Sequence, residues 1–186
     1  MSPAPIRVLH VRDSPWIDGP GRTILETGSA VDRTRVEYHM GAFVADSTVA
    51  HPFVDEARRR GLAVHPIPDS GGLSSQVLDR IVALIDEHRI DVLHTSEFRS
   101  NVMGLLCRRR RPGVRLVATV HGWIANDLKG RIYRLADKVL LRLFDATIFV
   151  SEATRGLIPR WWQPPRVHVL HNALVMNQYA AVGDTR

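Results

Sequence analysis

Short apolar runs recur along the chain, and segments with helical periodicity separate them. The runs are apolar on both sides rather than alternating with polar residues, which is typical of strands covered by helices on both faces of a sheet. They occupy residues 6–11, 36–44, 63–67, 91–94, 115–120, 146–150 and 167–170.

Between these runs, apolar residues recur at steps of three and four, which predicts helices over 23–30, 53–60, 74–89, 98–111, 128–143 and 152–158. Ser74 or Ser75 can cap the start of the third helix, and Pro112-Gly113 ends the fourth. In the helix over 128–143 we expect one apolar stripe to face the core, made of Ile132, Leu135, Ala136, Val139, Leu140 and Leu143.

Strands that alternate with helices indicate βαβ units. The sequence therefore predicts an α/β fold with a doubly wound, mainly parallel, seven-stranded Rossmann-like sheet. We expect one domain over 1–172 and an interdomain linker or disordered tail over 173–186. A chain of 186 residues is too short for two complete catalytic domains.

The first run is followed by Gly19-Pro20-Gly21, which leads into a helix. Glycines let the backbone approach an anion, and a helix N-terminus offers N–H groups and positive potential. A plain strand-to-helix turn is the alternative interpretation. Ile24 occupies the third glycine position of G-x-G-x-x-G, and G-K-[ST] is absent, so a dinucleotide fingerprint is disfavoured and a P-loop is excluded.

Two histidines, His94 and His121, end different predicted strands. Ligands of an open parallel sheet bind beyond the carboxyl ends of its strands, so these side chains should converge on one crevice. A single histidine at a strand end is more often packed than functional, but the joint placement favours a site. No carboxylate or thiol stands beside them at ligand spacing, so we expect no metal. His168 alternates with apolar neighbours and is expected to be structural.

The net charge of +6 comes from 25 basic residues, of which 23 are arginine. We expect Arg108–Arg111 to be a solvated last helical turn that complements the helix dipole. A second group recurs at steps of three and four along one helix, and it can either face solvent or lie on an anionic membrane. Its members are Arg131, Arg134, Lys138 and Arg142.

Other features of the composition narrow the class of protein. The single cysteine excludes a disulfide framework, and the lack of a signal-peptide pattern or a long apolar run indicates a cytoplasmic location. Nucleic acid is not expected, because no nucleic-acid motif occurs and the aromatic residues do not interleave with the basic runs. Trp161-Trp162 can serve as an interfacial anchor or pack against another domain.

Five segments, in this order, resemble the N-terminal half of a GT-B glycosyltransferase, specifically of the family 4 (group 1) retaining enzymes. The resemblance covers residues 6 to 172. The segments are Ile6–Val11 with its glycine loop, Asp91–His94, Ala118–Trp123, Phe144–Glu152 and Val167–Asn172.

The resemblance implies transfer of a hexose-type sugar, with retention, from a nucleotide sugar to a glycan or lipid-linked acceptor, as in polysaccharide biosynthesis. It implies no metal and no other cofactor. It also implies that this half builds the acceptor side of the cleft and holds no catalytic residue. The expected substrate- and donor-binding residues are Gly19, Gly21, Arg22, His94, His121 and Ser151.

The chain departs from the family pattern in three places. Pro20 removes one N–H donor from the glycine loop, Ala173 replaces a usual glycine, and no two glutamates have the E-x7-E spacing of the nucleotide-sugar domain. We therefore expect a missing C-terminal domain or partner chain, and no activity of this half alone, because half a cleft lacks most donor contacts. The alternative is a non-catalytic α/β module that binds a phosphorylated ligand at Gly19–Gly21.

Overall fold

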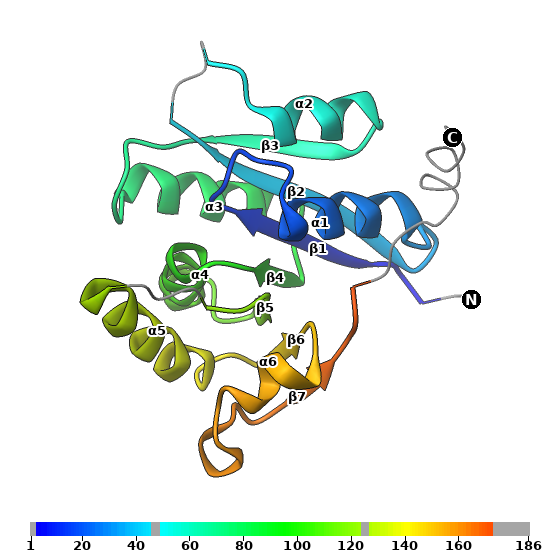
Figure 1. The fold of residues 1–186 in the computed structure, drawn as a ribbon. Helices are drawn as coiled ribbons and strands as arrows, with labels where there is room; N and C mark the ends of the chain where they lie inside the picture. The colour runs from blue at the N-terminus through cyan, green and yellow to red at the C-terminus, as the bar shows by residue number, and fades with distance from the viewer. Residues whose placement is uncertain (1–2, 46–48, 124–126, 173–186) are drawn as a thin grey trace, which may run out of the picture.

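A computed structural model describes residues 3–45, 49–123 and 127–172, which form a seven-stranded sheet between two layers of helices (Figure 1). Neighbouring strands are all parallel, in the order β3-β2-β1-β4-β5-β6-β7. This confirms the predicted doubly wound fold. The expected tail at 173–186 lies outside the described residues. The strands are β1 (Ile6–Arg12), β2 (Val36–Val44), β3 (Ala63–Pro68), β4 (Val92–Thr95), β5 (Arg115–Val120), β6 (Ala146–Phe149) and β7 (Val167–Val169).

Each predicted helix is present, with small shifts at its ends. The main difference is the first helix, which begins at Gly19 and not at Thr23, because Asp18 caps it and Pro20 fits its first turn. A 3-10 turn also spans Arg160–Trp162. The helices are α1 (Gly19–Ala30), α2 (Pro52–Arg59), α3 (Ser75–Glu87), α4 (Phe98–Arg110), α5 (Leu128–Leu141) and α6 (Glu152–Gly156).

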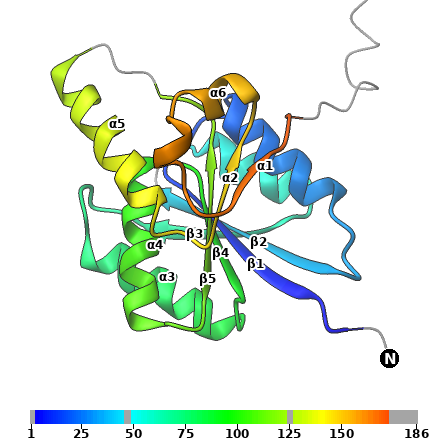
Figure 2. The same ribbon diagram turned by 90° about the horizontal axis from the view of Figure 1, so that it is seen from below.

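The two faces of the sheet have separate hydrophobic cores. Alternation along β2 shows the division: Met40 packs with α1 and α2 in one cluster, whereas Phe43 packs with α3 and α4 in the other. The larger cluster also takes in Leu141 and Phe144, from the end of α5 and the residues after it. Figure 2 shows α1 and α2 on one side of the sheet and α3 and α4 on the other.

The expectation that α5 turns its apolar stripe inward is wrong. Ile132, Leu135, Val139 and Leu143 are all about half exposed, between 47% and 58%. The helix packs against α4 along a different face, which carries the buried Asp137, and it lies at the outer end of its layer (Figure 2). None of the helices in the described ranges has the length and apolar content that a bilayer crossing requires.

Two smaller expectations also change. His168, on the edge strand β7, is exposed and not part of the core. In the arginine run at the end of α4, Arg110 pairs with Asp79 and Arg111 with Asp86, both on α3. These arginines therefore join two helices rather than only facing solvent.

The order of the strands defines where a ligand can bind. From β1 the chain first moves outward through β2 and β3, and then crosses back to β4 on the other side of β1. The connections therefore leave β1 and β4 in opposite directions, which opens a crevice at the carboxyl ends of these two strands.

Candidate functional site at the carboxyl edge of the sheet

A cavity of about 390 Å³ lies between α1 and the carboxyl ends of the central strands. The sheet contributes three histidines from three strands, namely His10 (β1), His94 (β4) and His121, which directly follows β5. The helix contributes Thr23 and Thr27. The predicted convergence of His94 and His121 on one crevice is therefore seen in the structure, and their role in binding stays a prediction.

His10 and His94 form a stacked pair in the wall of this cavity, with ring centroids 3.9 Å apart. Nδ1 of His10 lies 2.6 Å from the Tyr38 hydroxyl, and its Nε2 lies 2.7 Å from Oγ of Ser96. Nε2 of His94 lies 2.7 Å from Oγ1 of Thr119. Burial, together with the neighbouring His121, lowers the pKa of His94 to about 4, so both its ring and the wall it forms are uncharged at neutral pH.

His121 differs from the other two, because neither of its ring nitrogens has a hydrogen-bond partner although both are buried. Burial, and then the positive charge of Arg12, lowers the pKa of His121 to about 4. A neutral imidazole has one donor and one acceptor nitrogen. Buried polar atoms are rarely left without a hydrogen-bond partner, so His121 is suited to form hydrogen bonds with a hydroxyl group of a ligand.

A second cavity, of about 320 Å³, lies on the other side of His121, towards α5. Both cavities are lined by Thr119 and His121. The wall of the second cavity is fixed by Asp137, whose carboxylate accepts hydrogen bonds from Asn101 Nδ2 at 2.7 Å and Trp123 Nε1 at 2.8 Å. His121 thus stands between two ligand-sized spaces.

Beside this histidine lies a fully buried arginine, Arg12, at the end of β1. Its guanidinium donates to Asp18 at 2.7 Å and lies 3.7 Å from Glu97 Oε1. Burial raises the pKa of Glu97 to about 7, with smaller contributions in the same direction from Asp13 and Asp18, while Arg12 opposes the shift. A pKa near 7 lets Glu97 change charge near neutral pH.

The glycine loop is the first turn of α1. The N–H of Gly21 donates to Oδ1 of Asp18 at 2.9 Å, and a Cβ at Gly21 would lie 2.7 Å from the carbonyl oxygen of Trp16. Gly19 and Arg22 are exposed beside it, and the Arg22 N–H donates to the Asp18 carbonyl. Contact of Gly19, Gly21 or Arg22 with donor phosphates stays a prediction, and Asp18 already places a carboxylate at this helix end.

Ser151 is the N-cap of α6, where its Oγ accepts a hydrogen bond from the Thr154 N–H at 3.0 Å. The lining of the first cavity at this strand comes instead from Ile148 and Val150. A binding role for Ser151 also stays a prediction. The structure gives it a local role in starting the helix.

Sequence reasoning missed His10, Arg12 and Glu97. The sequence contained one signal for Arg12, which directly follows the apolar run over 6–11. A charged residue at the end of a buried strand must be paired if it is buried, so a partner for Arg12 could have been sought nearby. His10 and Glu97 gave no such signal, since their position depends on which strands are neighbours.

The comparisons with known proteins agree with this fold. HepE of Anabaena, solved in complex with UDP, has a TM-score of 0.74 to this chain at 14% identity, over 94% of this chain and 46% of HepE. The lipopolysaccharide outer core galactosyltransferase WaaB scores 0.64 at 9% identity, over 91% and 46%. Sucrose-phosphate synthase of Thermosynechococcus elongatus scores 0.65 at 14% identity, over 89% and 48%.

The chain thus spans about half the length of these structures, whose fold it shares. No curated protein matches it significantly. At the level of sequence, the model of the family described as Glycosyltransferase Family 4 matches residues 17–177. That range runs from the loop before α1 past β7 and contains His94, His121 and most of the crevice. With a parallel sheet of GT-B type and a family match over most of its length, the chain belongs to glycosyltransferase family 4.

Proposed function

We propose that this chain is the acceptor-side half of a retaining glycosyltransferase that moves a hexose from a nucleotide sugar to a glycan or lipid-linked acceptor. His121 is the observation that carries this proposal. Its two unpartnered nitrogens lie at the junction of two cavities, and a pKa of about 4 keeps the ring neutral at pH 7. A neutral ring binds a sugar hydroxyl by donating and accepting hydrogen bonds, whereas a phosphate calls for a cation.

The donor is held mainly by a second domain. The described crevice has one fully buried cation, Arg12, whose Nη2 donates to Asp18 at 2.7 Å and whose Nη1 has no hydrogen-bond partner. Because the Asp18 carboxylate offsets the charge of Arg12, this half alone supplies little net positive charge to stabilise a departing nucleoside diphosphate. HepE, which was solved with UDP, is about twice as long as this chain, which supports a C-terminal nucleotide-sugar domain or partner chain. The chemistry needs no metal or other cofactor from this half, and nucleic acid is not a partner.

The test is a transfer assay on the chain alone and on the chain combined with a nucleotide-sugar domain that carries E-x7-E, using labelled nucleotide sugars. We expect no transfer by the chain alone and transfer by the combination. His121→Ala should lower transfer by at least about 100-fold, and the exposed control His168→Ala should leave it unchanged. Absence of transfer from every sugar, or full activity of His121→Ala, would overturn the proposal.

The same proposal places the enzyme at the inner face of a membrane, with α5 as the contact. Leu128, Ile132, Leu135 and Val139 recur at steps of four, three and four, so they form one exposed apolar stripe. Arg131 is exposed beside this stripe. An apolar face flanked by positive charge is typical of helices that lie in an anionic membrane surface.

The predicted basic stripe is only partly available for that contact. Lys138 donates to the carbonyl oxygen of Leu157, and Arg142 lies 3.4 Å from the carbonyl oxygen of Gln163. These two side chains fasten α5 to the segment after α6. Of the predicted four, Arg131 and Arg134 remain to meet lipid headgroups, and the apolar stripe supplies most of the binding energy.

Flotation with vesicles of phosphatidylcholine, with and without phosphatidylglycerol, tests the membrane contact. We expect binding that increases with anionic lipid and is lost in Leu135→Glu. Ala153→Glu, which adds the same charge at an exposed position of α6, is the matched control and should bind as the unchanged protein does. Equal binding to both vesicles would overturn the role of the positive charges. Binding to neither would remove the membrane contact and favour coverage of α5 by another protein domain.

A further inference from the structure

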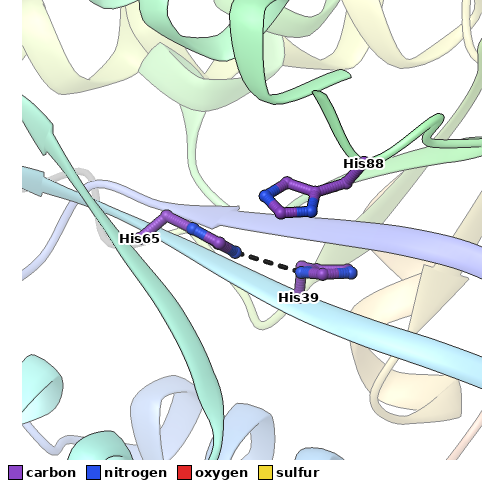
Figure 3. A group of neighbouring side chains, drawn as sticks. All are labelled: His39, His65 and His88. Carbon is purple, nitrogen blue, oxygen red and sulfur yellow. Dashed lines mark hydrogen bonds between the residues drawn. The ribbon is translucent and has the colours of Figure 1, made fainter. Parts of the chain in front are cut away.

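Three histidines from separate parts of the chain meet on the α3 side of the sheet (Figure 3). His39 lies in β2, His65 lies in β3, and His88 is the C-cap of α3. One ring nitrogen from each lies within 4.8 Å of the other two. The cluster is separate from the crevice, because α1 and the cavity lie on the other face of the sheet.

The spacing of the nitrogens suits a tetrahedral metal ion. Nδ1 of His39 and Nε2 of His65 are 3.0 Å apart. Two ligands of a tetrahedral zinc ion, each about 2.0–2.1 Å from the metal, are about 3.4 Å apart. A change of a few tenths of an ångström therefore converts this pair into two ligands. His88, with its ring centroid 4.4 Å from that of His39 and 4.7 Å from that of His65, needs only a small side-chain movement.

The hydrogen bonds around His39 already select the ligand atom. Its Nε2 donates to Oε1 of Glu37 at 2.9 Å, which leaves Nδ1 directed at His65. A carboxylate behind a metal-bound histidine fixes the tautomer and makes the ring a stronger ligand.

The charges around the three histidines are also compatible with a bound cation. The cluster lies at the C-terminal end of α3, where the helix dipole is negative. Arg80, a positive side chain that acts on His65, is paired with Glu87 at 2.9 Å. Arg89 adopts the left-handed conformation, with φ of 50°, and so ends the helix immediately after His88.

We propose that His39, His65 and His88 bind a zinc ion, with a water molecule as the fourth ligand. The ion would fasten the edge strand β3 to β2 and to the end of α3. Imidazole ligands in this number favour zinc over calcium or magnesium, which prefer oxygen. The site is independent of the glycosyl-transfer proposal, since no residue is shared between the two.

Zinc binding can be measured on this chain directly, without a polyhistidine tag and after treatment with a chelator. We expect one Zn²⁺ per chain by calorimetry, and Co²⁺ should give the intense visible absorption of a tetrahedral site. At 100-fold excess over its dissociation constant, Zn²⁺ should raise the Tm by about 5–10 °C.

The variants are His65→Ala and His88→Asn, since asparagine is a good residue at a helix end, and the control is the exposed His168→Ala. Both variants should lose the stoichiometric binding and the cobalt spectrum, while keeping the circular dichroism of the unchanged chain. His168→Ala should retain both signals. The proposal is overturned if the unchanged chain binds no zinc, or if both variants bind zinc as it does. Loss of binding in His168→Ala would assign the zinc to another site and overturn it equally.

Discussion

The imidazole ring of His10 lies on the ring of His94, with the two planes inclined by only 15°. The pair joins β1 to β4, the two strands at which the connections of the sheet reverse direction. Burial lowers the pKa of both rings, and each would repel a proton on the other. The wall of the crevice is thus built from two imidazoles that stay neutral together.

This stack makes the stability of the fold dependent on pH. An unfolded histidine takes up a proton below about pH 6.5, whereas folded His94 does so only near pH 4. Between these values the unfolded chain binds more protons, so the free energy of unfolding should fall as the pH is lowered through this window. His94→Gln should reduce the slope by up to about 1.4 kcal/mol per pH unit. Urea titrations at several pH values give the slope.

The matched control for this measurement is His168→Gln, which changes an exposed histidine on β7. It should leave the slope within error of that of the unchanged chain. An equal slope in His94→Gln and in the unchanged protein would contradict a neutral His94.

The sheet itself could be predicted from the sequence. The seven apolar runs match the seven strands, because strands covered on both faces need continuous apolar sequence, and this signal depends on local composition alone. The meeting of His94 and His121 could also be predicted, because both end parallel strands. That inference needs only the direction of the strands.

Features that depend on packing between elements could not be predicted. The rotation of α5 is set by Asp137, which turns inward to meet Asn101 and Trp123, and periodicity alone cannot show that a carboxylate replaces the apolar stripe on the buried side. The His39–His65 pair depends in the same way on the register of β2 against β3, in which His39 lies opposite Ala63 and His65 opposite Gly41.

Gly21 is required by close packing. Its missing Cβ would lie 2.7 Å from the Trp16 carbonyl oxygen and 3.2 Å from the Arg12 guanidinium carbon. Gly21→Ala should therefore lower the free energy of unfolding by about 1–3 kcal/mol. At Gly19 nothing lies within 4 Å of the added carbon, so Gly19→Ala should be neutral or slightly stabilising. Urea unfolding measures the free energy of unfolding of both variants. A loss only in Gly21→Ala supports close packing at Gly21, whereas equal losses would indicate that this turn does not tolerate alanine at either position.

The buried carboxylate of Asp137 accepts hydrogen bonds from two donors, on Asn101 and Trp123. Asp137→Ala leaves both without an acceptor, so the free energy of unfolding should fall by about 2–4 kcal/mol. Asp79→Ala, which removes a carboxylate from an exposed ion pair with Arg110, should cost less than about 1 kcal/mol. Urea unfolding followed by circular dichroism measures both, and similar losses in the two variants would contradict the structural role of Asp137.

Arg89 is the one described residue other than glycine with a positive φ, at 50°. A left-handed conformation costs a side-chain-bearing residue about 1–2 kcal/mol, whereas glycine adopts it without this cost. The N–H of the next residue, Ile90, donates to the Ile85 carbonyl at 2.9 Å, so the turn that ends α3 depends on this conformation. Arg89→Gly should therefore raise the free energy of unfolding by about 0.5–1 kcal/mol, after the greater freedom of glycine in the unfolded chain is subtracted.

The control is Arg109→Gly, because Arg109 lies in the right-handed last turn of α4. There the same replacement should instead lower the free energy of unfolding by up to about 1 kcal/mol. Opposite signs in urea titrations support the left-handed end of α3, and a loss in both variants would contradict it.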